Sequence, residues 1–169
     1  MAPPPTISIT SPASGSIFAA PASEQIVANA AVSSGTVTNV QFFTNNVACG
    51  TIVTPPFTLT PTLAAGNYAL TAAATAAGIS TTSSVVNISV VTPVAVTLTD
   101  EKVASSAHFQ FSYSANVGLS YVIDRATNLV AGPWVPIATN VAAGNPTNFV
   151  DISATSSPAY YRVGRLPNP

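Results

Sequence analysis

The chain has 169 residues, of which 47% are hydrophobic and only 5% are charged, and its formal net charge is −1. A typical soluble domain carries about 25% charged residues, so this surface must be covered mainly by Thr, Ser, Asn, Ala and Pro. Four basic residues cannot build the patch that tracks a nucleic-acid backbone or an anionic membrane, which argues against both partners.

Targeting and redox signals are sparse. Every apolar run is broken by Thr, Ser, Gly or Pro before it reaches the roughly 18 residues of a membrane-spanning helix. Residues 1–6 lack the basic start and apolar core of a signal peptide. Cys49 is the one cysteine, so no disulfide forms within the chain. Its apolar neighbours favour a small core residue over a nucleophile.

The first half of the chain predicts about eight short strands separated by turns, the pattern of an antiparallel sandwich. Thr6–Thr10 alternates and starts the series, and the Asn45-Asn46 pair predicts a hairpin turn. The other segments, in chain order, are 16–18, 25–32, 37–43, 47–54, 57–60, 66–78 and 81–91.

The segment 66–78 organises this half. Tyr68, Leu70, Ala72 and Ala74 share one face of an extended strand, as expected when one face lies on a core. A helix is the competing interpretation, because alanine is the best helix former. The turn signal at 64–67 and the interspersed threonines favour the strand.

In the segment 37–43 the same alternation predicts the direction of each side chain. Val40 and Phe42 should face inward together with Thr38, whereas Gln41 and Phe43 should face outward.

Three motifs in this half carry a resemblance. Residues 4–15, 35–43 and 65–72 resemble a bacterial immunoglobulin-like domain of the kind repeated in large secreted proteins, and the likeness spans residues 3–92. It implies that Tyr68 is a corner tyrosine whose hydroxyl satisfies a nearby backbone group. The acidic residues that this family often carries are missing from 32–35 and 75–78. Calcium prefers clustered carboxylates, so no calcium site is expected.

Thr92-Pro93 predicts a boundary, after which a second module begins. We interpret residues 100–102, Asp-Glu-Lys, as a solvated loop. In the segment 108–113, Phe109, Phe111 and Tyr113 share one face. The other strands are expected at 94–99, 120–125, 132–137, 148–152 and 160–163.

This second half resembles a small fibronectin type III-like module found at the C-termini of secreted bacterial proteins. The matching elements are residues 121–129, Trp134, 149–151 and 160–163, so the likeness spans about 94 to 167. The predicted fold is therefore all-β, with two tandem antiparallel β-sandwich modules. Residues 1–92 form the immunoglobulin-like sandwich, and residues 93–169 form the fibronectin III-like one.

Catalytic groups are scarce. His108 is the one histidine, and it begins a strand without the positioned hydroxyl of a serine triad or partners for a metal. Asp124 and Asp151 could meet in space, but Arg125 and Arg162 are equally good partners for them. A carboxylate pair for glycoside hydrolysis is therefore disfavoured. We expect no enzyme activity, no metal and no cofactor.

Aromatic side chains are the candidates for contacts. Trp134 could stack on a sugar, supplemented by Phe43, Tyr113 and Tyr160, and these four are the candidate ligand or partner contacts. Packing in a core or between modules is the favoured interpretation of Trp134. The candidate structural residues are Phe42, Tyr68, Trp134 and Tyr161. The glycosylation sequon at 87–89 lies inside a predicted strand and is interpreted as incidental.

These features predict a non-catalytic structural protein displayed on an extracellular surface or a virion, without membrane insertion. Its partners would be proteins, either copies of itself or a capsid or surface lattice, and contacts would run through strand edges and weakly charged faces. A leaderless start favours a virion decoration (capsid cement) protein or an extracellular filament subunit. The alternative is a carbohydrate-binding or adhesion accessory module of a larger secreted bacterial protein, with glycans as partners.

Overall fold

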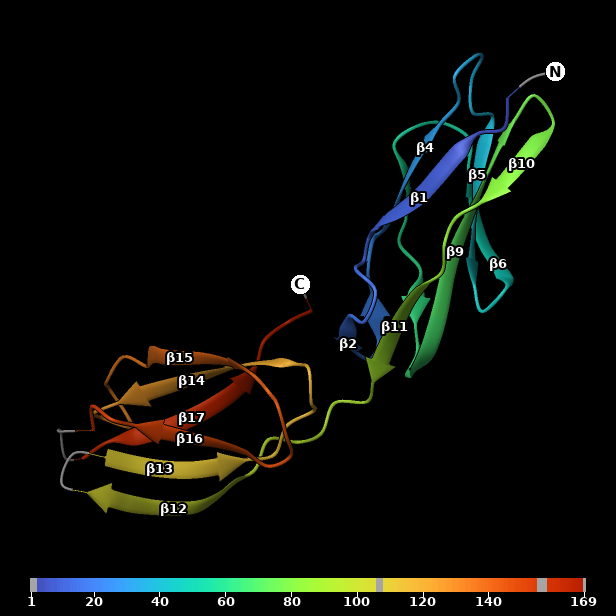
Figure 1. Cartoon of the computed structure of the whole chain (residues 1–169). Helices are drawn as coiled ribbons and strands as arrows, with labels where there is room; N and C mark the ends of the chain where they lie inside the picture. Colours follow the sequence, from blue (N-terminus) through green and yellow to red (C-terminus); the bar gives the residue numbers. More distant parts are fainter. Residues whose placement is uncertain (1–2, 106–107, 155–157, 169) are drawn as a thin grey trace. The chain divides into compact units, whose positions relative to one another are not determined.

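A computed structural model describes residues 3–105, 108–154 and 158–168, and it is all-β, with no helix among these residues. The chain divides into two compact units, Met1–Thr92 and Pro93–Pro169 (Figure 1). The all-β prediction is confirmed. Each unit is described by itself below.

In the described part of the first unit, residues 3–92, the strands form three sheets. One has the order β1-β4-β7, a second has the order β2-β11-β9-β5-β6 with β10 also paired to β9, and β3 pairs with β8. The strands are β1 (Thr6–Ser11), β2 (Ile17–Ala19), β3 (Ala22–Ser23), β4 (Ile26–Ala31), β5 (Asn39–Thr44), β6 (Val47–Ile52), β7 (Phe57–Leu59), β8 (Thr62–Leu63), β9 (Gly66–Ala76), β10 (Ile79–Thr82) and β11 (Val86–Val91).

Strand β9 is the centre of the larger sheet, which confirms the strand predicted at 66–78. Leu70, Ala72 and Ala74 are fully buried, and the residues between them are partly exposed. Phe42 of β5 lies opposite Ala72 and is also fully buried, as is Val40, so the predicted inward face of this segment is correct. The small alanines of β9 leave room for the large Phe42 ring, which is how the two strands share one tightly packed core.

Thr38 departs from its predicted inward position. It is exposed, and its hydroxyl donates to the carbonyl of Thr75 at 2.9 Å. The Thr75 carbonyl belongs to the central strand β9 and also accepts from the Thr38 N–H at 2.8 Å, so the hydroxyl adds a second bond to this carbonyl from an exposed position.

The predicted strand at 81–91 is two strands, β10 and β11, which pair with the same edge of β9 one after the other. The interruption between β10 and β11 begins at Ser83. Its N–H donates to the Ala72 carbonyl at 2.8 Å, and its hydroxyl accepts from the Ala72 N–H at 3.1 Å. One serine thus satisfies both backbone groups of a buried alanine where the ladder is interrupted.

The hairpin predicted at Asn45-Asn46 joins β5 to β6. Both asparagines have a positive φ, 51° and 64°, which is the conformation of the tight hairpin turns that suit the twist of paired strands. Asparagine tolerates this region better than most residues, so the two-residue signal predicts the turn correctly.

The described residues of the second unit form two three-stranded sheets, with the orders β12-β13-β16 and β15-β14-β17. The strands are β12 (Leu98–Ser105), β13 (His108–Tyr113), β14 (Ser120–Ala126), β15 (Val135–Val141), β16 (Thr147–Asp151) and β17 (Tyr160–Arg165).

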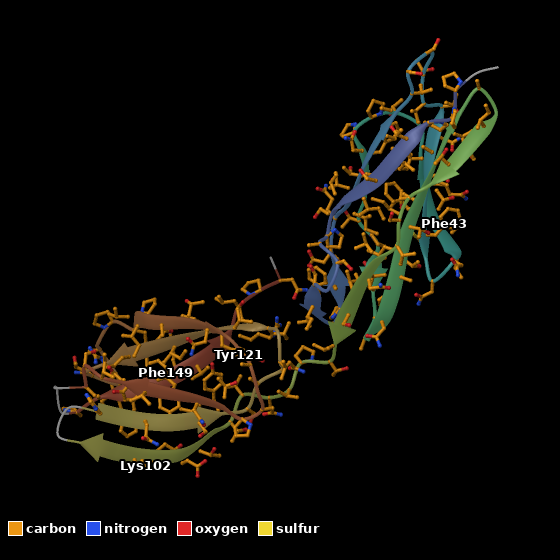
Figure 2. All side chains as sticks on the ribbon, viewed as in Figure 1. Phe43, Lys102, Tyr121 and Phe149 are labelled. Carbon is orange, nitrogen blue, oxygen red and sulfur yellow. The ribbon has the colours of Figure 1, made fainter. Side chains whose placement is uncertain are left out.

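Aromatic rings fill the interior of this unit. Tyr113 and Tyr121 have ring centroids 5.6 Å apart, and Phe111 and Phe149 have centroids 5.4 Å apart. Figure 2 labels Tyr121 and Phe149, whose side chains come from different sheets of the unit. Tilted rings at these separations stabilise one another beyond the area they bury.

The prediction of a solvated loop at residues 100–102 is wrong, because these residues form part of a strand. Asp100, Glu101 and Lys102 lie within β12, although all three are exposed (Lys102 is labelled in Figure 2). Asp100 has a positive φ of 57°, and the pairing with β13 is irregular between Thr99 and Lys102. A bulge lets an edge strand carry three charged residues into solvent without leaving the sheet.

We predict that Ser83→Ala lowers the free energy of unfolding of the first unit by about 1–3 kcal/mol, because the buried N–H of Ala72 loses its acceptor. The measurement is a urea titration of the full chain followed through the NMR amide signals of β9, which separates this unit from the other. Ser84→Ala, at an exposed neighbour, is the control and should change stability by less than about 0.5 kcal/mol. Equal effects of the two substitutions would contradict the role of Ser83.

Candidate functional site

A polar cluster in the second unit surrounds the carboxylate of Asp151, which lies at the end of β16 and is buried. One oxygen, Oδ2, accepts from Arg125 Nη1 at 2.7 Å and from the Tyr161 hydroxyl at 2.9 Å. The other, Oδ1, accepts from the Ser153 N–H at 2.8 Å and from its hydroxyl at 2.9 Å. Both oxygens are therefore fully used by the protein itself.

The strand register explains how these residues meet. Asp151 lies opposite Phe109 in one sheet, and Arg125 lies opposite Tyr161 in the other. The ring of Tyr161 stacks on Phe109 with centroids 4.9 Å apart. The cluster thus joins the two sheets through an ion pair, a hydrogen bond and a ring stack. This geometry supports the structural role proposed for Tyr161.

The acid–base properties of the cluster follow from its contacts. Burial raises the pKa of Asp151, but the hydrogen bonds from Ser153, Tyr161 and Arg125 stabilise the charged form and leave that pKa below its usual value. Burial, together with the hydrogen bond to Asp151 and its negative charge, raises the pKa of Tyr161 to about 12. Asp151 is therefore a carboxylate and Tyr161 a neutral phenol over the ordinary pH range.

The second acid, Asp124 of β14, is paired separately. Its Oδ2 accepts from Arg162 Nε at 2.8 Å, and the guanidinium carbon of Arg162 lies 4.6 Å from the centre of the Trp134 ring. A cation over an indole face is attracted by the ring electrons. One face of Trp134 is thus in contact with Arg162, which supports a structural role for Trp134 and reduces the surface it could offer to a sugar.

The hypothesis of a carboxylate pair can now be assessed. Asp151 pairs with Arg125, and Asp124 pairs with Arg162. Glycoside hydrolysis by two carboxylates needs one of them to hold a proton near neutral pH, which requires a raised pKa. The pKa of Asp151 is lowered instead. The arrangement can neutralise buried charge and fasten two sheets, and it lacks the features of an acid–base pair.

One predicted contact residue is wrong. Tyr113 is completely buried, because it faces inward on β13 and packs on Tyr121. It therefore cannot touch a ligand or a partner. Phe43, Trp134 and Tyr160 are partly exposed, with Phe43 in the first unit and the other two in the second. Their role as contacts stays a prediction.

Tyr68 has the geometry that the resemblance implied. Its hydroxyl donates to the carbonyl of Ala64 at 2.9 Å, and its ring packs against the core that contains Phe42. The hydrogen bond holds the start of β9 to the turn before it. Together with the packing of the ring, it supports a structural role for Tyr68 and Phe42.

The remaining reactive groups form no site. His108 is exposed at the start of β13, and burial raises the pKa of the Cys49 thiol. Within residues 3–105, 108–154 and 158–168, no three His, Cys, Asp or Glu side chains gather as metal ligands would. No helix in the same residues is long and apolar enough to cross a membrane.

Sequence reasoning missed two features. The contact of Arg162 in β17 with Trp134, the residue before β15, joins distant parts of the sequence, and only the folded structure reveals it. A polar groove on the first unit was also missed. It is lined by Asn45, Asn67 and Asn87 with Ser89, which come from three separate segments. An excess of asparagine at strand positions, where it is normally depleted, was the one available signal.

Comparison with known proteins identifies part of the chain. Residues 5–72 match the family model of the bacterial Ig domain. No curated protein is significantly similar to the chain. Among solved structures, the fibronectin(III)-like modules of Clostridium thermocellum CbhA are 30% identical, with a TM-score of 0.48, over 50% of this chain and 94% of that one.

Two further matches are to whole enzymes. A β-glucuronidase of Bacteroides uniformis is 11% identical with a TM-score of 0.40, and β-glucuronidase 2 of that organism is 11% identical with a TM-score of 0.38. Each alignment covers 97% of this chain and 27% of the enzyme, so the chain spans little more than a quarter of either length.

We predict that Asp151→Asn destabilises the second unit by about 2–3 kcal/mol, because it removes one partner of an ion pair whose Arg125 is three-quarters buried. Asp124→Asn, whose partner Arg162 is more than half exposed, should cost less than about 1 kcal/mol. Urea unfolding followed by the fluorescence of Trp134, the chain's one tryptophan, reports this unit. A larger loss for Asp124→Asn would contradict the ranking.

The raised pKa of Tyr161 predicts an alkaline loss of stability. The ordinary tyrosine pKa is 10.0, so between pH 10 and about 12 the unfolded chain gives up a proton that the folded chain keeps. Stability is therefore fully present below pH 10 and falls as pH rises towards 12. Urea unfolding at a series of alkaline pH values should show a smaller fall for Tyr161→Phe. Parallel curves for the two proteins would refute this assignment.

Proposed function

The first unit of this chain contains a bacterial immunoglobulin domain, and we propose on that basis that the chain is a non-catalytic surface module that works through protein contacts. Within this class we propose that copies of the chain associate through a free strand edge. Two settings fit that behaviour, a virion decoration protein and a subunit of an extracellular filament. Each repeats one contact between identical subunits on an exterior surface.

The observation that carries the proposal is the edge strand β16 of the second unit. It pairs with β13 on one side, and no described strand pairs with the other side. Val150 on this strand is 45% exposed, and Ile152 directly after it is 72% exposed. Asp151, the one charged residue of β16, is buried and paired with Arg125, so the exposed part of this edge is uncharged and partly apolar. Such an edge with unpaired backbone groups is the usual template for the addition of another strand.

The other edges of the second unit carry features that hinder pairing. Strand β12 displays the charged residues 100–102 and two irregularities in its register. Strand β15 contains Pro136, which lacks the N–H of a ladder, and β17 carries the exposed Arg162 and Arg165. Charge, bulges and proline are the devices that keep edges apart. The contrast singles out β16.

A second copy is the partner that this edge fits best. Two antiparallel β16 strands meeting about a two-fold axis at Phe149 would place the uncharged Asn148 of one copy opposite the uncharged Val150 of the other. No like charges would then face each other, since Asp151 is buried in its own unit and paired with Arg125. Backbone hydrogen bonds across the edge would supply the affinity, and the valines would supply buried apolar surface.

Carbohydrate binding is a second candidate function, in which the chain serves as an adhesion or accessory module of a larger secreted protein. One observation favours it, the asparagine-lined groove of the first unit. It does not depend on the aromatic residues that the sequence suggested. The groove is considered in the next subsection.

We predict that Val150→Lys weakens self-association of the full chain at least tenfold, because a lysine on an open edge must be desolvated when another strand is added. Sedimentation velocity over a range of protein concentrations measures the effect. Val130→Lys is the matched control, since Val130 is 95% exposed but lies between β14 and β15 rather than on an edge.

Two outcomes would overturn the proposed contact. One is a wild-type chain that stays monomeric at every concentration up to the solubility limit. The other is an equal loss of association in both lysine variants, which would point to a general effect of charge and not to β16.

A further inference from the structure

The groove on the first unit has a volume of about 450 Å³ and lies where β9, β11 and the turn after β5 come together. Strands β9 and β11 run side by side in the sheet (Figure 1). Asn87 lies opposite Ala69, and Ser89 lies opposite Asn67, so these side chains share one face of the two strands. Asn45 closes the groove from the hairpin turn.

Asn45 builds the wall of the groove. Its Oδ1 accepts from the N–H of Ala69 at 2.8 Å, and its Nδ2 donates to the carbonyl of Asn67 at 3.1 Å. The N–H of Asn45 also donates to the carbonyl of Ala69 at 2.9 Å. Held at three points, this turn is a fixed part of the first unit, so the groove is formed before any ligand arrives.

The side-chain amides of Asn67 and Asn87 also line the groove and can form hydrogen bonds with a ligand. The Oδ1 of Asn67 accepts from the Ser89 hydroxyl at 2.8 Å, which leaves its Nδ2 donors without a partner in the described chain. The side chain of Asn87 is exposed and likewise makes no hydrogen bond within the described residues. Its amide therefore offers both a donor and an acceptor to a ligand.

The near absence of charged side chains in the first unit restricts the kind of ligand that the groove can bind. Glu24 is the one charged side chain among residues 1–92 of the sequence, and it does not line the groove. A phosphate, a sulfate or an acidic sugar would find no cation there, and an amine would find no carboxylate. A ligand that matches this groove must be uncharged and rich in hydrogen-bonding groups of both kinds.

Apolar surface completes the match. Ala69 offers its methyl group between the polar side chains, whereas Tyr68 and Ile88 border the groove with side chains that face the core on the other side of the strands. A sugar ring presents hydroxyl groups at its rim and C–H groups on its faces, so it can use amides and apolar atoms together. The volume falls in the lower part of the range of small-molecule sites, about 300–1,000 Å³, which suits a short stretch of an oligosaccharide.

We propose that this groove binds a neutral oligosaccharide, with Asn67 and Asn87 as the residues that hydrogen-bond its hydroxyl groups. The groove is open to solvent, and few groups contact the sugar, so the expected dissociation constant is about 1 mM. The inference is independent of the proposed self-association, because the groove lies in the first unit and β16 lies in the second.

The test is an NMR titration of the full ¹⁵N-labelled chain with cello-, malto-, xylo- and mannohexaose at millimolar concentrations, and with acidic hexagalacturonate for comparison. Binding of at least one neutral sugar should shift the side-chain amide signals of Asn67 and Asn87 and the backbone signals of Ala69 and Ser89. Hexagalacturonate should shift them less. These signals belong to the first unit and report the groove whether or not the chain associates.

The decisive variant is Asn87→Ala, which removes an exposed side chain that makes no bond in the described protein and should leave the fold unchanged. It should weaken binding of that sugar about five- to tenfold, the usual effect of losing one or two hydrogen bonds. Asn29→Ala, at an exposed position on β4 in the other sheet, is the matched control and should bind as the wild type does.

Several results would overturn the proposal. They are the absence of shifts with all four neutral sugars, shifts confined to residues outside the groove, equal binding of hexagalacturonate, and unchanged affinity in Asn87→Ala. Shifts near Trp134 and Tyr160 would move sugar binding to the second unit. Monomeric behaviour of the chain would overturn the β16 contact and leave this result intact.

Discussion

The first unit has almost no charge, and the rest of its structure depends on that constraint. With Glu24 as its one charged side chain, it cannot use ion pairs for stability, solubility or recognition. Its stability comes from a core in which the alanines of β9 lie beside larger residues such as Phe42 on the neighbouring strand. Where a strand ladder is interrupted, neutral groups form the hydrogen bonds that the backbone needs, as Ser83 does for the N–H and carbonyl of Ala72. This surface must therefore recognise a partner mainly through neutral hydrogen-bonding groups and apolar side chains.

The second unit uses charge differently. Its two buried acids each meet an arginine, and the pairs fix β14, β16 and β17 relative to one another. Tyr161 belongs to both the ionic and the aromatic part of this arrangement, since its hydroxyl binds Asp151 and its ring stacks on Phe109. The charges that remain exposed lie on edge strands β12 and β17, where they discourage pairing. With charge on β12 and β17 and Pro136 on β15, β16 is the edge of this unit without such a feature.

The sequence predicted features that depend on local patterns. A period of two identified the buried face of β9, and two asparagines identified the hairpin after β5. Prediction from the sequence failed where contacts between residues distant in the chain determine the structure. The strand expected at 81–91 is divided because Ser83 replaces a ladder bond, and Tyr113 is buried because β14 places Tyr121 against it. The groove could not be foreseen, since the register between β9 and β11 and the fold of the turn at Asn45 bring its asparagines together.

The central claim is that this chain acts through uncharged contacts, and the dependence of its self-association on salt tests that claim most directly. Sedimentation velocity at low and at high ionic strength gives the association constant under both conditions. Contacts between neutral edges are not screened, so the constant should stay the same or rise slightly with salt. A constant that falls steeply as salt increases would mean that charged residues hold the copies together, and it would contradict the account.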